Sequence, residues 1–242
     1  MRRISEINRS ACSHCASPEE QFAAFVAEPV FPCLGAKAAF NSSSYMVRVY
    51  ERLAHPFHSK RLARDLEKFQ RSELRRVSDY ATFVAIFRQP RRVSEEKFDK
   101  LLWSQLQLLH HIDAQRYAWD SSVASNLDDP HFSFSFAGKA LYVIGMHAHS
   151  SRFARRFTWP TLIFNPHEQF ERMRHDGTWR RMRESIRQRD VMLQGNVNPM
   201  LSDFGETSEA GQYSGRVVEE SWHPQFQQEK FPARPSGCPF AH

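Results

Sequence analysis

Apolar residues recur at helical spacing in four parts of the chain. Residues 17–20, Ser-Pro-Glu-Glu, combine an N-cap serine, a proline at the first helical position and a glutamate three residues after the cap. They predict a helix from there to about residue 28. Further helices are predicted from Ser59 through Phe69, from Ser94 to about Tyr117, and over 166–189 with an interruption near Gly177.

Strand patterns lie between these helices. Residues 80–87 are rich in β-branched and aromatic side chains and end at Pro90, and residues 132–136 alternate Phe and Ser, which predicts a strand with one buried face. Gly138 predicts a hairpin into a fully apolar strand over 141–146, and 161–164 is a further short strand. Asn165 is predicted to cap the helix that follows, with Glu168 completing the capping arrangement. The irregular succession of helices and strands predicts a single α+β domain with a small mixed or antiparallel sheet flanked by helices.

The pattern fails after Leu193, where the chain becomes polar, glycine-bearing and aperiodic as far as about residue 218. We expect a long polar loop near the C-terminus, and a loop of that length within a compact domain points to function. The predicted organisation is a flexible N-terminal segment over 1–16, one domain over 17–218, and a C-terminal tail over 219–242.

Composition narrows the protein class. No run approaches the roughly 18 apolar residues of a membrane-spanning helix. The basic N-terminus leads into polar residues rather than the apolar region of a secretory signal. Four cysteines in 242 residues are too few for a disulfide scaffold. A cytoplasmic protein with reduced thiols and no membrane partner is expected.

The net charge of +6 is concentrated in one segment. Residues 152–189 hold ten arginines, no lysine and four acids. Guanidinium groups bind carboxylates and phosphates in a bidentate manner, although such a segment can equally form a solvated helix face. Nucleic acid is not an expected partner, because lysines and exposed stacking aromatics are missing from this segment.

Several residues could carry chemistry. His147 and His149 follow an apolar strand, and on an extended backbone they face one side, which suits a two-histidine metal site. A single histidine beside arginines suits a haem iron with propionate partners, and His147 could also be an ordinary core residue. Cys33 is either a thiolate ligand or a small buried side chain. Cys12 and Cys15 have CxxC spacing without a second metal-binding pair.

Longer stretches of the chain resemble the YqcI/YcgG family. The first stretch is residues 145–157, which begins Gly-Met-His147, includes Arg152 and ends Arg-Arg-Phe157. The second is residues 164–171, Phe-Asn-Pro-His-Glu-Gln-Phe-Glu. The third is residues 194–203, Gln-Gly-Asn-Val-Asn-Pro-Met-Leu-Ser-Asp. Phe31-Pro-Cys33, 132–136, Gln212-Tyr213-Ser-Gly and Cys238-Pro-Phe240 are further landmarks. One departure is the Ala-His that follows His147, where the family pattern has a proline and a small residue.

The resemblance implies a haem-dependent N-hydroxylase that uses O2 on a guanidino or amino nitrogen of arginine or an arginine-like small molecule. It implies haem b as the cofactor and a ferredoxin or flavoprotein reductase as the external electron donor. His147 is then the axial iron ligand, with Cys33 as the alternative. The haem propionates are expected to bind Arg152, Arg155 and Arg156. A carboxylate must bind the guanidinium, for which the candidates are Glu168, Asp203, Glu206 and Glu209.

Two other functions stay open at this point. One is a non-haem metalloenzyme with a His147, His149 and carboxylate site, and the other is a haem-binding protein without turnover. The oligomeric state is open between a monomer and a homodimer.

Overall fold

A five-stranded sheet forms the centre of the computed structural model, which describes residues 16–229. The strands are β1 (Tyr45–Arg52), β2 (Thr82–Gln89), β3 (Phe134–Phe136), β4 (Lys139–Met146) and β5 (Thr161–Pro166), in the spatial order β1-β2-β5-β4-β3. β1 and β2 are parallel and the other neighbours are antiparallel. The sheet is therefore mixed, with β5 at its middle.

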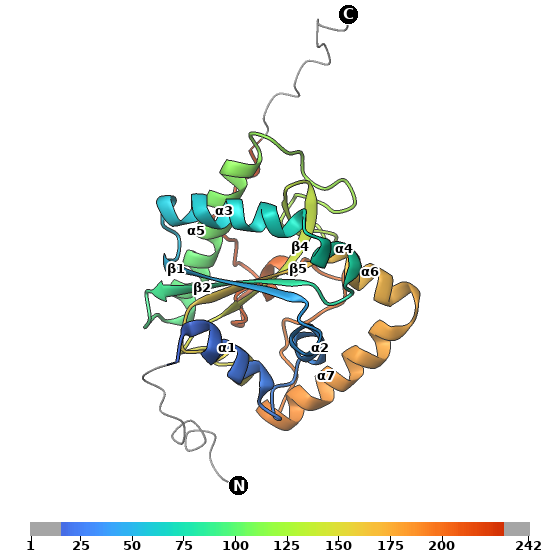
Figure 1. The fold of residues 1–242 in the computed structure, drawn as a ribbon. Helices are drawn as coiled ribbons and strands as arrows, with labels where there is room; N and C mark the ends of the chain where they lie inside the picture. Colours follow the sequence, from blue (N-terminus) through green and yellow to red (C-terminus); the bar gives the residue numbers. More distant parts are fainter. Residues whose placement is uncertain (1–15, 230–242) are drawn as a thin grey trace, which may run out of the picture.

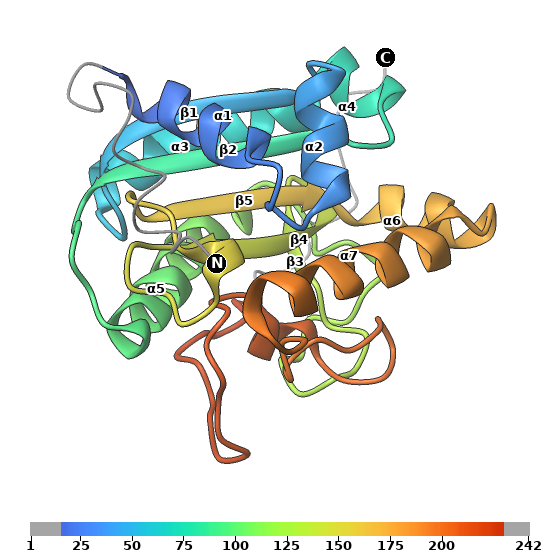
Figure 2. The ribbon, with the colours of Figure 1, turned by 90° about the horizontal axis from the view of Figure 1, so that it is seen from below.

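Helices cover both faces of this sheet (Figures 1 and 2). They are α1 (Pro18–Ala27), α2 (Leu34–Asn41), α3 (Pro56–Gln70), α4 (Glu73–Val77), α5 (Glu95–Asp113), α6 (His167–His175) and α7 (Thr178–Gln194), with short 3-10 turns η2 (Phe153–Arg155) and η3 (Glu209–Gln212). No helix within residues 16–229 is long and apolar enough to cross a membrane. The predicted single α+β domain is confirmed.

Alternate residues of the strands face two separate apolar clusters. On β2, Phe83, Ala85 and Phe87 point into the larger cluster with α3 and α5, whereas Val84 and Ile86 point to the smaller cluster with α1 and α2. Because β2 is buried on both faces, its sequence is a continuous apolar run without alternation. Both faces of the sheet are thus available to position side chains.

Most predicted elements are present, and three were missed. The capping box at Ser17 and Glu20 is formed, and Gly177 adopts a positive φ of 75° between α6 and α7, as the predicted interruption requires. β1, α2 and α4 were not predicted. The charged side chains of β1 and the small residues of α2 obscure the strand and helix periods, and α4 has only five residues.

Two local predictions were wrong. The serines around β3 are buried rather than exposed, because the preceding loop covers them and Asp120 N–H donates to Ser135 Oγ at 2.9 Å. Asn165 does not cap α6. It belongs to β5, where its side chain accepts a 2.9 Å hydrogen bond from the Thr82 hydroxyl.

Residues 219–229 pack onto the domain, although the sequence assigned them to a tail. Phe226 is 8 % exposed and its ring lies 5.7 Å from that of Trp103 on α5. The Trp222 indole donates to Asp99 at 2.9 Å, and Glu229 N–H donates to His110 at the same distance. The packed domain therefore extends past residue 218. The predicted N-terminal segment up to residue 15, the Cys12–Cys15 motif, Cys238 and the tail from residue 230 lie outside the described residues.

Candidate functional site

His147 follows directly after β4 and is buried against α5. It is 1 % exposed, and its ring stacks on Phe98 at 4.4 Å with an interplanar angle of 24°. α5 approaches closely because residue 145 is glycine; a Cβ there would lie 2.7 Å from the Leu102 and Phe98 side chains. Burial lowers the pKa of His147 to about 4. The imidazole is therefore uncharged at neutral pH, as a metal ligand must be.

The nitrogen Nδ1 of His147 is buried and has no hydrogen-bond partner among the described residues. Buried imidazole nitrogens are normally paired, so this atom is available to bind a further group. The backbone of His147 is fixed by a hydrogen bond, in which its N–H donates to Arg155 O at 3.1 Å.

His149 does not join His147. The chain turns directly after β4, with Ser150 N–H donating to His147 O at 3.3 Å, so the extended backbone predicted for 147–149 is wrong. His149 Nδ1 instead lies 3.1 Å from Val93 O. Nowhere in the described part of the chain do three His, Cys, Asp or Glu side chains come within reach of one metal ion. The predicted site of His147, His149 and a carboxylate is therefore not formed.

The three arginines after His147 point to different parts of the molecule. Arg152 is buried and donates to Asp190 on α7 and to Asn196. Arg155 Nη1 donates to the carbonyls of Gln212 and Tyr213, both at 2.9 Å. Arg156 Nε donates to Ser150 O at 2.9 Å, and its guanidinium lies over the Phe153 ring. Within the described residues, only Arg152 is paired with a carboxylate, whereas Arg155 and Arg156 donate to backbone carbonyls, and the three guanidinium groups do not share a partner.

Cys33 caps the N-terminus of α2. Its Sγ accepts a hydrogen bond from Ala36 N–H at 3.4 Å, and the side chain is half-buried. Burial raises the pKa of the thiol, which Arg155 partly offsets. Cys33 packs with the α1 and α2 cluster, whereas His147 stacks on Phe98 of the α3 and α5 cluster. The two candidate iron ligands lie on opposite faces of the sheet, so a single haem can contact only one of them.

Three of the predicted carboxylates are at the surface or already paired. Glu168 lies 2.8 Å from Arg75 Nη1 and also pairs with Arg172. Asp203 pairs with Arg183 of α7. Glu206 is exposed, and its Oε2 accepts from the Asp203 backbone N–H at 3.0 Å. These residues stabilise local structure and do not converge on His147.

Glu209 behaves differently, because η3 carries it into the interior. It is 5 % exposed and lies beside His167, the first residue of α6, and the hydroxyl of Tyr213. Glu209 is one of the four carboxylates that the sequence leaves unranked, and the sequence places His167 only in the first turn of a predicted helix. Only the turn at 208–213 brings these side chains together, and no local pattern encodes that contact.

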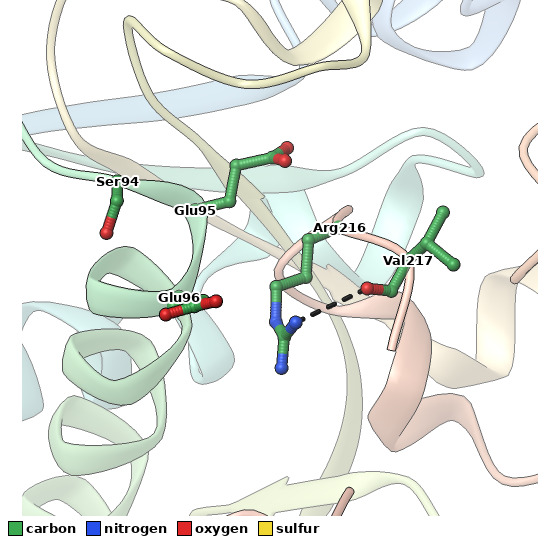
Figure 3. Close-up of a pocket in the computed structure, with 5 residues that line it drawn as sticks. All are labelled: Ser94, Glu95, Glu96, Arg216 and Val217. Atoms are coloured by element: carbon green, nitrogen blue, oxygen red, sulfur yellow. Dashed lines mark hydrogen bonds between the residues drawn. The ribbon is translucent and has the colours of Figure 1, made fainter. Parts of the chain in front are cut away.

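A shallow hollow at the start of α5 is lined by Ser94, Glu95, Glu96, Arg216 and Val217 (Figure 3). Arg216 extends across it and donates to Val217 O at 3.4 Å. Charged side chains dominate this lining, whereas cofactor sites are predominantly apolar. The hollow includes none of the predicted site residues.

Comparison with known protein families supports the resemblance. The model of the YqcI/YcgG family matches residues 22–227, which is most of the chain. The chain belongs to the YqcI/YcgG family. This YqcI/YcgG domain ends at residue 227 in the match, close to the end of the segment that packs on α5. Searches of curated proteins and of solved structures gave no match.

Proposed function

We propose that this YqcI/YcgG protein is a haem-dependent N-hydroxylase that uses O2 on a guanidino or amino nitrogen of an arginine-like small molecule. Family membership supports the proposal through the chemistry that the resemblance implies. The observation that carries it is the buried, uncharged imidazole of His147, whose Nδ1 has no partner in the described chain. A neutral imidazole nitrogen without a protein partner is what an axial iron ligand requires.

The residues fit haem in part. His147 would hold the iron, and bound haem would supply the redox-active centre that activates O2 with two electrons from an external donor. The arginines do not fit their predicted role, since Arg152, Arg155 and Arg156 are engaged elsewhere. They instead fix the turn that follows β4, and with it the position of His147. Because His147 is 1 % exposed, loading must open contacts over its ring.

Spectroscopy of three variants tests the ligand assignment. Protein expressed with haem supplied is examined as the ferric, reduced and CO-bound forms, in wild type and in His147→Ala, Cys33→Ser and His149→Ala. We expect His147→Ala alone to lose tight haem binding, and the CO complex to have the spectrum of histidine ligation. An unchanged Soret band in His147→Ala removes this residue as the ligand. A thiolate-type CO spectrum that Cys33→Ser abolishes transfers the role to Cys33.

Turnover is tested separately on haem-loaded protein supplied with O2, a reductant and L-arginine or a related guanidine. N-hydroxylated product supports the enzyme. Stable haem binding without product from any of these compounds would indicate a haem-binding protein instead. Absence of haem binding under all conditions would overturn the proposal.

A further inference from the structure

A group of buried polar side chains lies at the start of α6. His167 and Glu209 are each 5 % exposed, and His167 Nε2 lies 3.9 Å from Glu209 Oε1. This separation is too long for a direct hydrogen bond, and Nε2 has no hydrogen-bond partner among the described residues. The Tyr213 hydroxyl lies 3.4 Å from the other carboxylate oxygen of Glu209. The cluster therefore has unused hydrogen-bonding capacity in the interior.

Glu209 also lacks a strong cationic partner. Of the four carboxylates that could bind a cation, Glu206 and Glu209 have no arginine or lysine within ion-pair distance in the described chain, and only Glu209 of these two is buried. Its neighbour His167 is neutral at pH 7, because burial lowers the pKa of the imidazole. Arg174 acts on Glu209 only from a distance, and its guanidinium pairs with Glu171. A buried carboxylate is unfavourable in its ionised form without a counter-charge, so a cation bound beside Glu209 would stabilise that form.

The cluster lies directly beneath one aromatic side chain. The Phe204 ring is 4.4 Å from the His167 ring, and Phe204 is half-buried. The surrounding turn is held by Gly205 N–H, which donates to Pro130 O at 3.1 Å, and by the pair of Asp203 with Arg183. Phe204 belongs to this turn and not to a strand, so its ring could rotate off His167 without disturbing the sheet.

We propose that Glu209, His167 and Tyr213 form a subsite for the cationic head group, guanidinium or ammonium, of a small organic ligand, with Phe204 closing over it. Glu209 accepts hydrogen bonds from the cation, and the flat rings of His167 and Phe204 confine it. The assignment rests on the proposed function, since it identifies the residue that holds the cationic end of the substrate.

The subsite predicts a specific pH dependence. Burial raises the pKa of Glu209 to about 8, so the carboxyl must lose a proton before it binds a cation at neutral pH. Affinity should therefore rise by up to about tenfold per pH unit from pH 6 to 7.5 and level off above pH 8. Apart from burial, the groups that act on Glu209 are Ser133, Arg174, Tyr213 and Glu171. Glu171, Arg174 and Asp120 act on its neighbour His167, and Tyr142 lies within range of the Glu209 charge.

The pKa values of the shifted neighbours all move away from this range. Burial lowers the pKa of His167 and raises those of Tyr142 and Tyr213. The pKa of Asp120 is lowered by the hydrogen bonds it accepts, despite its partial burial. Exposed carboxylates are fully ionised above pH 6 and would give a flat profile.

Calorimetric titration of the full-length, haem-loaded protein tests the subsite by binding rather than turnover. The probes are L-arginine, methylguanidine, which carries the guanidinium alone, and L-norvaline, which carries the ammonium without the guanidinium. We compare wild type with Glu209→Gln and with Glu184→Gln, an exposed acid on α7. We expect Glu209→Gln to weaken binding at least tenfold and to remove its pH dependence, while Glu184→Gln resembles wild type. Methylguanidine or L-norvaline identifies which head group is bound.

The outcomes separate the two proposals. Wild-type affinity in folded Glu209→Gln, a flat pH profile in wild type, or no binding of any probe overturns the subsite, even if haem binding persists. If Glu209→Gln fails to fold, the pH dependence of cation affinity in the wild-type protein still tests the subsite. Protein that binds no haem yet shows Glu209-dependent binding of a cation retains the subsite and overturns the hydroxylase.

Discussion

Arg155 shows at the scale of one residue how the structure reassigns a predicted function. Its guanidinium donates to the carbonyls of Gln212 and Tyr213 and so joins the turn after β4 to η3. Space for this side chain exists because residue 215 is glycine with a φ of 84°; a Cβ there would lie 2.4 Å from Arg155 Cδ. The arginine predicted to bind a propionate thus connects the segment of His147 with that of Glu209.

Replacing this glycine tests the connection. Gly215→Ala must strain a left-handed backbone and displace Arg155, with loss of its charged hydrogen bonds. Gly195→Ala is the matched control, because Gly195 has a similar φ of 88° and open space around its Cα. We expect Gly215→Ala to lower the free energy of unfolding by about 2 kcal/mol more than Gly195→Ala. Equal losses in urea denaturation would show that Arg155 is not held in this position.

At the scale of elements, the buried ion pair between Arg152 and Asp190 attaches α7 to the rest of the domain. Most of its apolar side chains are only half-buried, so packing alone holds the helix weakly. The pair of Arg152 with Asp190 joins its last turns to the segment after β4, and Asn196 adds a backbone acceptor at 2.9 Å. α7 runs beside α2 in Figure 2, so this pair also helps to hold α7 against α2.

Breaking the pair from one side should be strongly destabilising. Asp190→Ala leaves the buried Arg152 charge unpaired, for which we expect a loss of about 3–5 kcal/mol in unfolding free energy. Glu184→Ala removes an exposed pair with Arg180 on the same helix and should change it by less than about 0.5 kcal/mol. The double variant Arg152→Met, Asp190→Leu should recover much of the loss. A small effect of Asp190→Ala would contradict the assignment of this pair as the fastening of α7.

At the scale of the whole molecule, the C-terminal segment completes the larger core. Phe226 enters a group of aromatic rings from α5, β3 and the loop between them: Trp103, His110, Trp119 and Phe134. Residues 219–229 therefore cover part of this ring cluster. The family match, over residues 22–227, includes Phe226.

Phe226→Ala should therefore destabilise the whole domain. We expect a loss of about 3–5 kcal/mol, because the neighbouring rings are supported from several elements and cannot collapse fully into the cavity. Val217→Ala, at a position 57 % exposed, should change stability by less than about 0.5 kcal/mol. Thermal and urea unfolding measure both variants. A Phe226→Ala protein as stable as Val217→Ala would show that the segment is not part of the core.

The sequence by itself determined the elements whose signals are local. The capping box at Ser17, the helical spacing of 94–117, the apolar run of 141–146 and the break at Gly177 each depend on residues within one or two turns, so period and turn chemistry predicted them. The family landmarks are equally readable in the chain, and they indicated His147.

Only the tertiary structure decided which side chains meet. It separated His147 from His149 by a turn, directed the three arginines to different partners, and moved Glu209 from a polar loop into the interior beside His167. It also returned Phe226 to the core. These contacts join residues far apart in the sequence, and their energies depend on burial and charge balance in the folded protein, which no local pattern records.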